Sequence, residues 1–198
     1  MLKASIRSRQ FDRITSPVYH GTLSHNYFSL LKGVDINAGR RNLDFGKGFY
    51  LTTDFRQASE IAKRKADNLG ADPIVFVYNL DRTRLRNDFK GQIFTRMNEK
   101  WSDFIYMNRS SLFDMGSQYD YVFGGVADGT DLFALIDEIN MHYKNSGEIK
   151  SSYFLHNIAK YMYDQLVICN SDIIKHGVLK LDKVVIAYDQ NEEYVPKP

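Results

Sequence analysis

The sequence predicts an α+β domain, and two observations carry this prediction. Segments typical of helices alternate with about six segments typical of strands, but several elements are grouped, which favours α+β over a doubly wound parallel sheet. The length of 198 residues suits one domain of ordinary size with a substantial core. A hydrophobic content of 43% and a charged content of 25% fit a globular protein, so we expect one domain over residues 1–198.

The composition excludes several classes of protein. The single cysteine, Cys169, cannot form an internal disulfide, and the N-terminus has no apolar run typical of a secretory leader. We therefore expect a reducing, cytoplasmic location. No stretch approaches ~18 uninterrupted apolar residues, so we expect no contact with a membrane interior. The sequence also has no paired Cys or His at metal-ligand spacing, and we expect no metal site.

Charge is distributed unevenly along the chain. The net charge is +2, but residues 1–72 hold 12 Lys and Arg against 7 Asp and Glu. This surplus is compatible with binding of an anionic ligand. A solvated surface is the plainer explanation, because surplus charge reports on association and solubility rather than on fold.

The densest local signal is the segment Asp-Phe-Gly-Lys-Gly-Phe-Tyr-Leu-Thr-Thr-Asp at 44–54. Gly46 and Gly48 allow backbone angles closed to other residues, so we expect a sharp turn that approaches a ligand or another strand closely. The apolar residues that follow predict a short strand. Asp54 is expected to cap the next helix, and Gln57 is expected to complete a capping box.

The other elements are predicted from hydrophobic periodicity and from punctuation by glycine and proline. Strands are expected at 17–22, 49–53, 73–78, 119–127, 165–169 and 179–188. Helices are expected at 24–33, 55–69, 95–109, 128–139, 152–163 and 171–177. Residues 82–95 are expected to form a loop that carries no readable code. Residues 1–15 could be an edge strand, an arm or a frayed terminus, and 192–198 are expected to be loose.

Several conspicuous residues have plain structural explanations. Trp101 recurs with other apolar residues at helical spacing, which indicates core, although it and Arg109 could also flank a ligand. His142 and His156 fit ordinary helix surfaces. The Gly124-Gly125 pair suggests a bulge or a close approach within a strand.

Four motifs are informative as an ordered set. They are Tyr-His-Gly-Thr at 19–22, the glycine segment at 44–53, Tyr-Asp-Tyr-Val-Phe-Gly-Gly-Val-Ala-Asp at 119–128, and Tyr-Asp-Gln-Leu-Val at 163–167. Together they resemble the ADP-ribosyltransferase fold in its histidine–tyrosine–glutamate branch, the branch of diphtheria toxin and the poly-ADP-ribose polymerases. The chain more closely resembles a small uncharacterised prokaryotic family of transferase-like proteins, often encoded in toxin–antitoxin gene pairs. The resemblance covers most of residues 17–185.

The resemblance implies a pair of split antiparallel sheets with flanking helices and with NAD in a cleft between them. By position, His20 would hydrogen-bond the adenosine-side ribose. The backbone of Gly21 would contact the nicotinamide amide, and Tyr50 would stack on the nicotinamide ring. Thr22, the last residue of the same motif, would also belong to the cofactor-binding residues. An aromatic face suits this role because it attracts a flat cationic ring.

The long polar loop at 34–47 is a further candidate for binding the cofactor. It carries Arg40, Arg41 and Lys47, which the resemblance places near the pyrophosphate. Arginine can bind such a group with two parallel hydrogen bonds.

The chain departs from the branch at the third site residue, where the glutamate aligns with Gln165. A glutamine can still accept a hydrogen bond from a ribose hydroxyl, but it lacks the charge that makes such a bond roughly twice as strong. It also cannot act as a base. Asp164 cannot replace it, because neighbours on a strand point to opposite faces. Glutamine is usual at this position in the more similar family, which favours an active enzyme.

The resemblance therefore implies an NAD-dependent ADP-ribosyltransferase with His20, Tyr50 and Gln165 as catalytic residues. It would mono-ADP-ribosylate a macromolecular acceptor, either protein or nucleic acid, as the toxin of a pair whose antitoxin would be a protein partner. Two alternatives stay open. One is an NAD glycohydrolase with water as acceptor, and the other is a non-catalytic NAD-binding or protein-interaction module.

Overall fold

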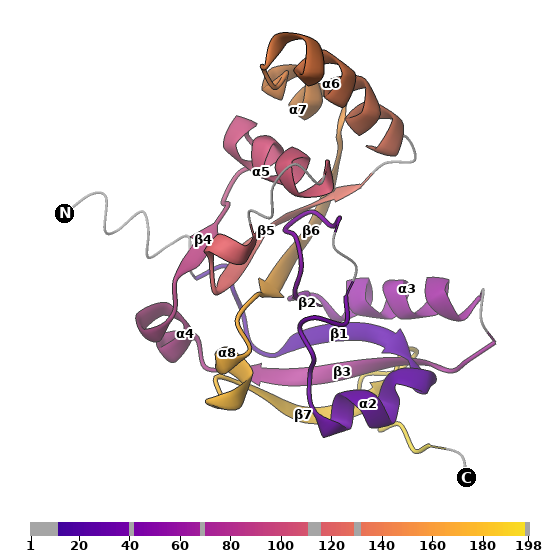
Figure 1. The fold of residues 1–198 in the computed structure, drawn as a ribbon. Helices are drawn as coiled ribbons and strands as arrows, with labels where there is room; N and C mark the ends of the chain where they lie inside the picture. Colours follow the sequence, from indigo (N-terminus) through magenta and orange to yellow (C-terminus); the bar gives the residue numbers. More distant parts are fainter. Residues whose placement is uncertain (1–11, 40–41, 68–69, 111–115, 129–131, 197–198) are drawn as a thin grey trace.

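The computed structural model describes residues 12–39, 42–67, 70–110, 116–128 and 132–196, which form two β-sheets with helices around them (Figure 1). The three-stranded sheet has the order β1 (Val18–Leu23), β3 (Pro73–Leu80), β7 (Leu179–Ile186). The four-stranded sheet has the order β2 (Phe49–Leu51), β6 (Ala159–Ile168), β5 (Tyr121–Asp128), β4 (Gly91–Ile93). The α+β class is confirmed.

The expectation that both sheets are antiparallel is wrong at one pair of strands. β4 runs parallel to β5, whereas the other neighbours are antiparallel. Parallel neighbours need a crossover connection, and α5 (Glu99–Arg109) supplies it between these two strands. The expected loop at 82–95 is wrong, because α4 (Arg82–Asp88) and β4 lie within it, and both elements are too short to show a clear period in the sequence.

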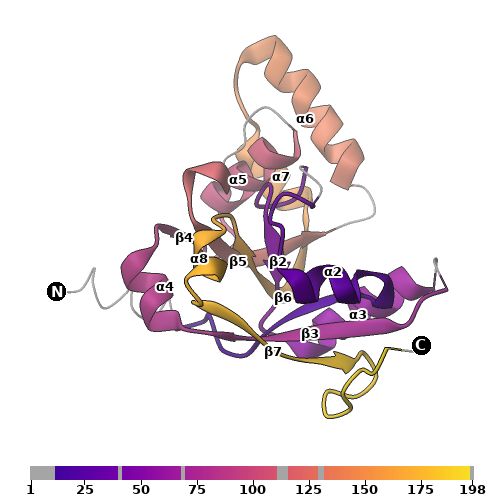
Figure 2. The ribbon, with the colours of Figure 1, turned by 60° about the horizontal axis from the view of Figure 1, so that its bottom comes forward.

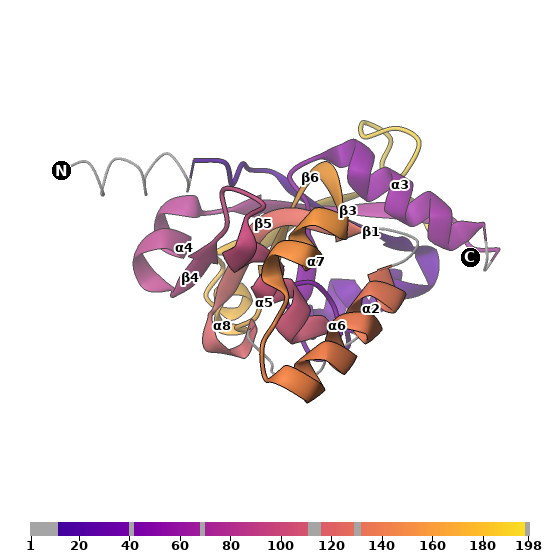
Figure 3. The same cartoon turned by 90° about the horizontal axis from the view of Figure 1, so that it is seen from above.

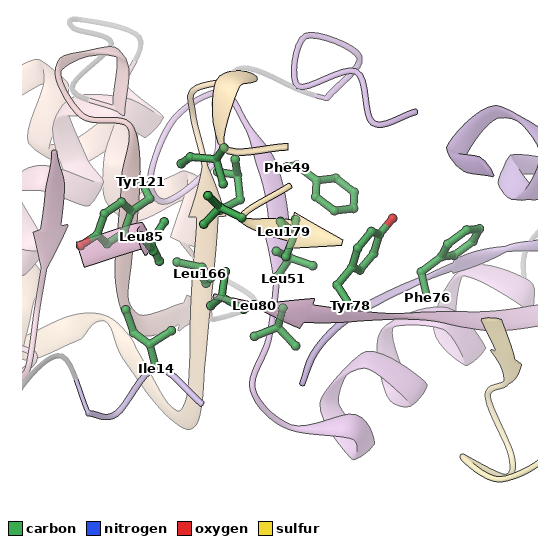
Figure 4. Close-up of a cluster of buried hydrophobic side chains, with 14 of the residues drawn as sticks. Ile14, Phe49, Leu51, Phe76, Tyr78, Leu80, Leu85, Tyr121, Leu166 and Leu179 are labelled. Atoms are coloured by element: carbon green, nitrogen blue, oxygen red, sulfur yellow. The ribbon is translucent and has the colours of Figure 1, made fainter. Parts of the chain in front are cut away.

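The two sheets are joined where β1 meets β2. Tyr19 and Thr52 exchange both backbone hydrogen bonds, at N···O distances of 2.8 and 2.9 Å. Apolar side chains from both sheets then fill one core between them (Figure 4). Its labelled members are Ile14, Phe49, Leu51, Phe76, Tyr78, Leu80, Leu85, Tyr121, Leu166 and Leu179.

Helices cover the remaining sheet faces. α3 (Phe55–Ala66) packs on β1 and β3 through Ala58 and Ala62. A second core lies between the four-stranded sheet and α5, α6 (Leu132–Ser146) and α7 (Ser151–Asn157). These helices gather at one end of the molecule in Figures 1 and 2, and this end faces the viewer in Figure 3. Trp101 is fully buried there, as expected. None of the described helices is long and apolar enough to cross a bilayer.

The expected helix at 152–163 is wrong in its second half. α7 ends at Asn157, and β6 begins at Ala159. The segment pairs with β5, where Lys160 lies opposite Ala127, so partners distant in sequence override a local helical pattern. The expected bulge is confirmed, because the register of this pair shifts between Gly125 and Ala127.

The expected helix at 24–33 is also shorter than predicted. A 3₁₀ turn (Ser24–Asn26) precedes α2 (Tyr27–Lys32), and Ser24 accepts a hydrogen bond from the Asp72 N–H instead of capping the helix. The helix expected to begin at 95 begins at Glu99. Near the C-terminus, α8 (Asp172–Lys175) forms as expected, but without a side-chain cap from Ser171.

Both terminal segments are better anchored than expected. Ile14 is fully buried, and Arg13 binds Asp164 at 3.0 Å, so the described part of 1–15 is not frayed. At the other end, Glu193 is bridged to Val185, and the Tyr194 N–H donates to the β7 backbone. Residues 192–194 are therefore not loose.

Candidate functional site

The glycine turn before β2 forms as the sequence predicts. Gly46 has a φ of 79°, which other residues rarely adopt. A Cβ at Gly48 would lie 2.6 Å from the Val167 side chain and 2.7 Å from the Ile168 carbonyl oxygen, so only glycine lets this turn approach β6. The predicted close approach to another strand is confirmed.

Tyr50 braces this turn through its hydroxyl group. The hydroxyl donates to the Gly46 carbonyl at 2.7 Å and accepts from the Phe45 N–H at 3.1 Å. Burial raises the Tyr50 pKa well above its ordinary value, and the charge of Asp44 raises it further. The half-buried Tyr50 ring is thus fixed before any ligand arrives, and its hydroxyl stays protonated.

The helix that follows β2 is capped by Asp54, as expected. Asp54 Oδ1 accepts from the N–H groups of Arg56 at 2.7 Å and of Gln57 at 3.3 Å. The second half of the capping box is wrong, because Gln57 hydrogen-bonds the Thr52 hydroxyl instead. That hydroxyl accepts the Asp54 N–H at 3.1 Å and so takes the role expected of Gln57.

The structure brings His20 and Tyr50 together. His20 Nδ1 lies 2.7 Å from the Tyr50 carbonyl oxygen, and its ring packs against Phe49 with 4.6 Å between centroids. Because a carbonyl oxygen only accepts, Nδ1 carries the proton, and Nε2 of the neutral ring is left as an acceptor.

His20 stays neutral at pH values well below those at which a histidine ordinarily takes up a proton. Burial, with a smaller contribution from the charge of Lys65, lowers the His20 pKa to about 4. The Tyr50 carbonyl favours the protonated ring but does not outweigh burial. Between pH 6.5 and pH 4, the histidine of the unfolded chain binds a proton and the buried His20 of the folded protein does not. Acid therefore favours the unfolded chain, and the stability contributed by His20 is fully present only above pH 6.5.

We expect this contribution to be lost as the pH falls from 6.5 to 4. Wild type and His20→Gln should be compared by urea unfolding across that range, because glutamine is neutral throughout. The stability difference in favour of wild type should shrink by up to about 3 kcal/mol on acidification. A difference that does not change with pH would contradict the buried neutral state of His20.

Gly21 and Thr22 have structural roles in addition to any ligand contact. A Cβ on Gly21 would overlap the carbonyl oxygen of Ala58, so glycine is needed for α3 to pack on β1. The Gly21 carbonyl accepts from Lys65 Nζ at 3.0 Å, and the Thr22 hydroxyl accepts from Asn26 at 2.8 Å. Because alternate residues of a strand point their N–H groups to the same side, the Gly21 N–H points toward β2, as the Tyr19 N–H does.

Gln165 lies on β6 beside a buried ionic cluster. Its Nε2 donates to Asp44 Oδ2 at 2.7 Å, and the Ala127 N–H donates to the same oxygen at 2.9 Å. Arg109 binds the other oxygen, Oδ1, through both Nε and Nη2 at 2.6 Å. Asn108 donates to the Asp44 main-chain carbonyl at 3.2 Å. The carboxylate is 4% exposed and fully hydrogen-bonded.

Strand register places Tyr50 and Gln165 on one sheet face. Tyr50 lies opposite Val167, and Gln165 is two residues further along that face of β6. Such diagonal neighbours lie about 7–8 Å apart, within reach of one small ligand. Asp164 points to the opposite face, where Arg13 binds it.

Three residues of this region were not assigned a role by the sequence prediction. The sequence indicates Asp44 only as the start of the turn and Arg109 only as a possible ligand neighbour, and its helical spacing predicts that Lys65 is mostly exposed. A carboxylate next to a glycine turn was the available signal for Asp44, but no local pattern links it to Arg109. Arg40 and Arg41 lie outside the described residues, and Lys47 is half-buried beside the turn.

Two hollows lined by described residues lie elsewhere. A hollow of about 570 Å³ lies between β4 and α5, and one of about 310 Å³ lies beside the end of β7. Neither includes His20, Tyr50 or Gln165. Within the described ranges, no group of three or more His, Cys, Asp or Glu side chains could hold a metal ion.

Comparison with known proteins identifies a family but no activity. Residues 17–179 match the model of a family described as a protein of unknown function (DUF3990), so the chain belongs to that family. No curated protein and no solved structure matches the chain.

Proposed function

We propose that this protein is an NAD-dependent ADP-ribosyltransferase with a macromolecular acceptor. The observation that supports it most is that β2 carries Tyr50 between His20 on β1 and Gln165 on β6. His20 contacts the Tyr50 backbone directly, and Tyr50 and Gln165 share one sheet face. These are the three positions at which the sequence resembles the histidine–tyrosine–glutamate branch.

The chemistry of the three side chains fits NAD. Nε2 of neutral His20 can accept a hydrogen bond from a ribose hydroxyl, and the half-buried Tyr50 ring offers a fixed aromatic face. The oxygen of Gln165 can accept from the hydroxyl next to the reacting sugar carbon. The Lys65 ammonium, which hydrogen-bonds Gly21 beside His20, adds positive charge suited to a pyrophosphate.

In the proposed reaction, the bond between nicotinamide and the ribose carbon breaks, and its electron pair leaves with nicotinamide. The sugar acquires oxocarbenium character, and hydrogen bonds to its 2-hydroxyl strengthen as it does so. An acceptor nucleophile then bonds to that carbon and loses its proton to its own surroundings. Gln165 cannot take this proton, so the site favours an acceptor that is already nucleophilic over water.

We place this activity in a toxin of a toxin–antitoxin pair acting in the cytoplasm, with the antitoxin as protein partner. This placement follows the resemblance to the prokaryotic family.

Labelled NAD tests the proposal and separates it from its alternatives. The purified protein is incubated with NAD labelled in the ADP-ribose part and with cell lysate, and the products are digested separately with protease and with nuclease. We expect label in macromolecules, removed by one of the two enzymes. Nicotinamide release without macromolecular label would instead indicate a glycohydrolase, and NAD binding without release would indicate a binding module.

A further inference from the structure

The hydrogen-bond partner of the Gln165 amide determines which end of the amide is the nitrogen and which is the oxygen. A charged carboxylate only accepts hydrogen bonds, so the group 2.7 Å from Asp44 Oδ2 must be the amide nitrogen. The amide oxygen, Oε1, therefore points away from Asp44. Among the described residues, no donor is hydrogen-bonded to that oxygen.

Asp44 itself has little freedom to move. Arg109 binds Oδ1 through two nitrogens, and the Ala127 N–H binds Oδ2 from the bulge of β5. These bonds come from α5 and β5, while Asp44 belongs to the turn before β2. Two separate elements, α5 and β5, thus hold the carboxylate of Asp44 against β6.

In the histidine–tyrosine–glutamate branch, the third site residue itself carries a negative charge. Here the charge is on Asp44, which lies behind Gln165 and hydrogen-bonds its amide nitrogen. A charge-assisted bond to the amide nitrogen polarises the amide, and neighbouring hydrogen bonds of this kind strengthen one another in a medium of low dielectric constant. The oxygen of Gln165 is then a better acceptor than that of a glutamine in water.

We propose that Asp44, anchored by Arg109, is a positioning residue that turns the oxygen of Gln165 toward the substrate and lets a neutral glutamine accept the ribose hydroxyl. This inference rests on the proposed function for the identity of the ligand. It also explains why glutamine suits position 165. A glutamate there would place a second carboxylate at hydrogen-bond distance from Asp44, and two carboxylates so close cannot both be charged.

The test is an exchange of the two side chains. Gln165→Glu creates the carboxylate pair, Asp44→Asn removes the charge, and the double variant Asp44→Asn/Gln165→Glu restores one amide and one carboxylate beside Arg109. Gln190→Glu adds the same charge at an exposed loop position and serves as the control.

The first readout is thermal unfolding at pH 5 and pH 8 without ligand. At pH 8 the Tm of Gln165→Glu should fall by roughly 5–10 °C, and the double variant should recover at least half of that loss. At pH 5 the Tm difference between wild type and Gln165→Glu should be smaller. The carboxylate pair of the folded variant keeps a proton that the unfolded chain releases, so the stability of this variant decreases as the pH rises. The titratable neighbours of the pair are Arg109 and Tyr50, and burial holds the pKa of the Tyr50 hydroxyl well above its ordinary value.

The second readout separates positioning from plain structure. Asp44→Asn leaves an amide facing an amide, so the Gln165 side chain can flip and its oxygen is no longer held outward. We expect kcat for nicotinamide release to fall about tenfold while the Kd for NAD changes less than twofold. The double variant should regain this rate, because it again presents an oriented acceptor.

Each outcome has a distinct meaning. Equal Tm losses in the single and double variants would show that the pair is not coupled and would overturn the inference. Tm recovery with an unchanged kcat in Asp44→Asn would reduce Asp44 to a structural role and also overturn it. Absence of nicotinamide release by wild type would overturn the proposed function, and with it the proposal that Gln165 accepts the ribose hydroxyl. Recovery of the Tm in the double variant would in that case still report on the Asp44–Gln165 contact. If Asp44→Asn does not fold, Gln165→Glu at the two pH values still tests that contact.

Discussion

Replacing Asp44 with alanine is expected to lower the free energy of unfolding by about 3–5 kcal/mol. The substitution leaves the Arg109 guanidinium, whose side chain is 15% exposed, without its carboxylate. It also leaves the Ala127 N–H and the Gln165 amide nitrogen without an acceptor, and each buried unsatisfied group adds to the cost. Urea unfolding at neutral pH measures the loss.

Asp88→Ala is the matched control for this experiment. Asp88 pairs with Arg84 one helical turn away, but both side chains are more than 40% exposed. Such a pair contributes at most about 0.5 kcal/mol. If Asp44→Ala were no more destabilising than Asp88→Ala, the buried cluster would not have the energetic role that its geometry indicates.

Gly21→Ala is expected to destabilise the protein by about 3 kcal/mol, because the new methyl group would overlap the Ala58 carbonyl and force α3 away from β1. The control is Gly147→Ala, where φ is 74° but nothing lies within 4 Å of the new methyl group. That variant should lose only about 1 kcal/mol of backbone strain. Equal losses in the two variants would show that the helix and strand are less tightly packed than the structure indicates.

The sequence predicted the elements whose cause is local. The turn at Gly46 and Gly48, the cap at Asp54 and the core position of Trp101 follow from backbone freedom, side-chain hydrogen bonding and periodicity within a few residues. The bulge at Gly125 belongs to the same group. Each of these was predicted from residues that are neighbours in the sequence.

The parts that could not be predicted depend on partners distant in sequence. The sequence predicts a helix at the start of β6, because the pairing of this segment with β5 leaves no local signal. Asp44, Arg109 and Gln165 lie 56 to 121 residues apart in pairs, so no spacing rule could assemble them. The site was therefore predicted as a set of ligand contacts, whereas the buried support behind Gln165 emerged only from the structure.

The most direct test of the central proposal is the rate of nicotinamide release from NAD by wild type and by Gln165→Ala. Wild type should release nicotinamide in the presence of lysate acceptors. Gln165→Ala should be about 10- to 100-fold slower, because the ribose hydroxyl loses its acceptor in the transition state. Absence of release by wild type, or equal rates for the two proteins, would contradict the proposal that this site transfers ADP-ribose with Gln165 as its third residue.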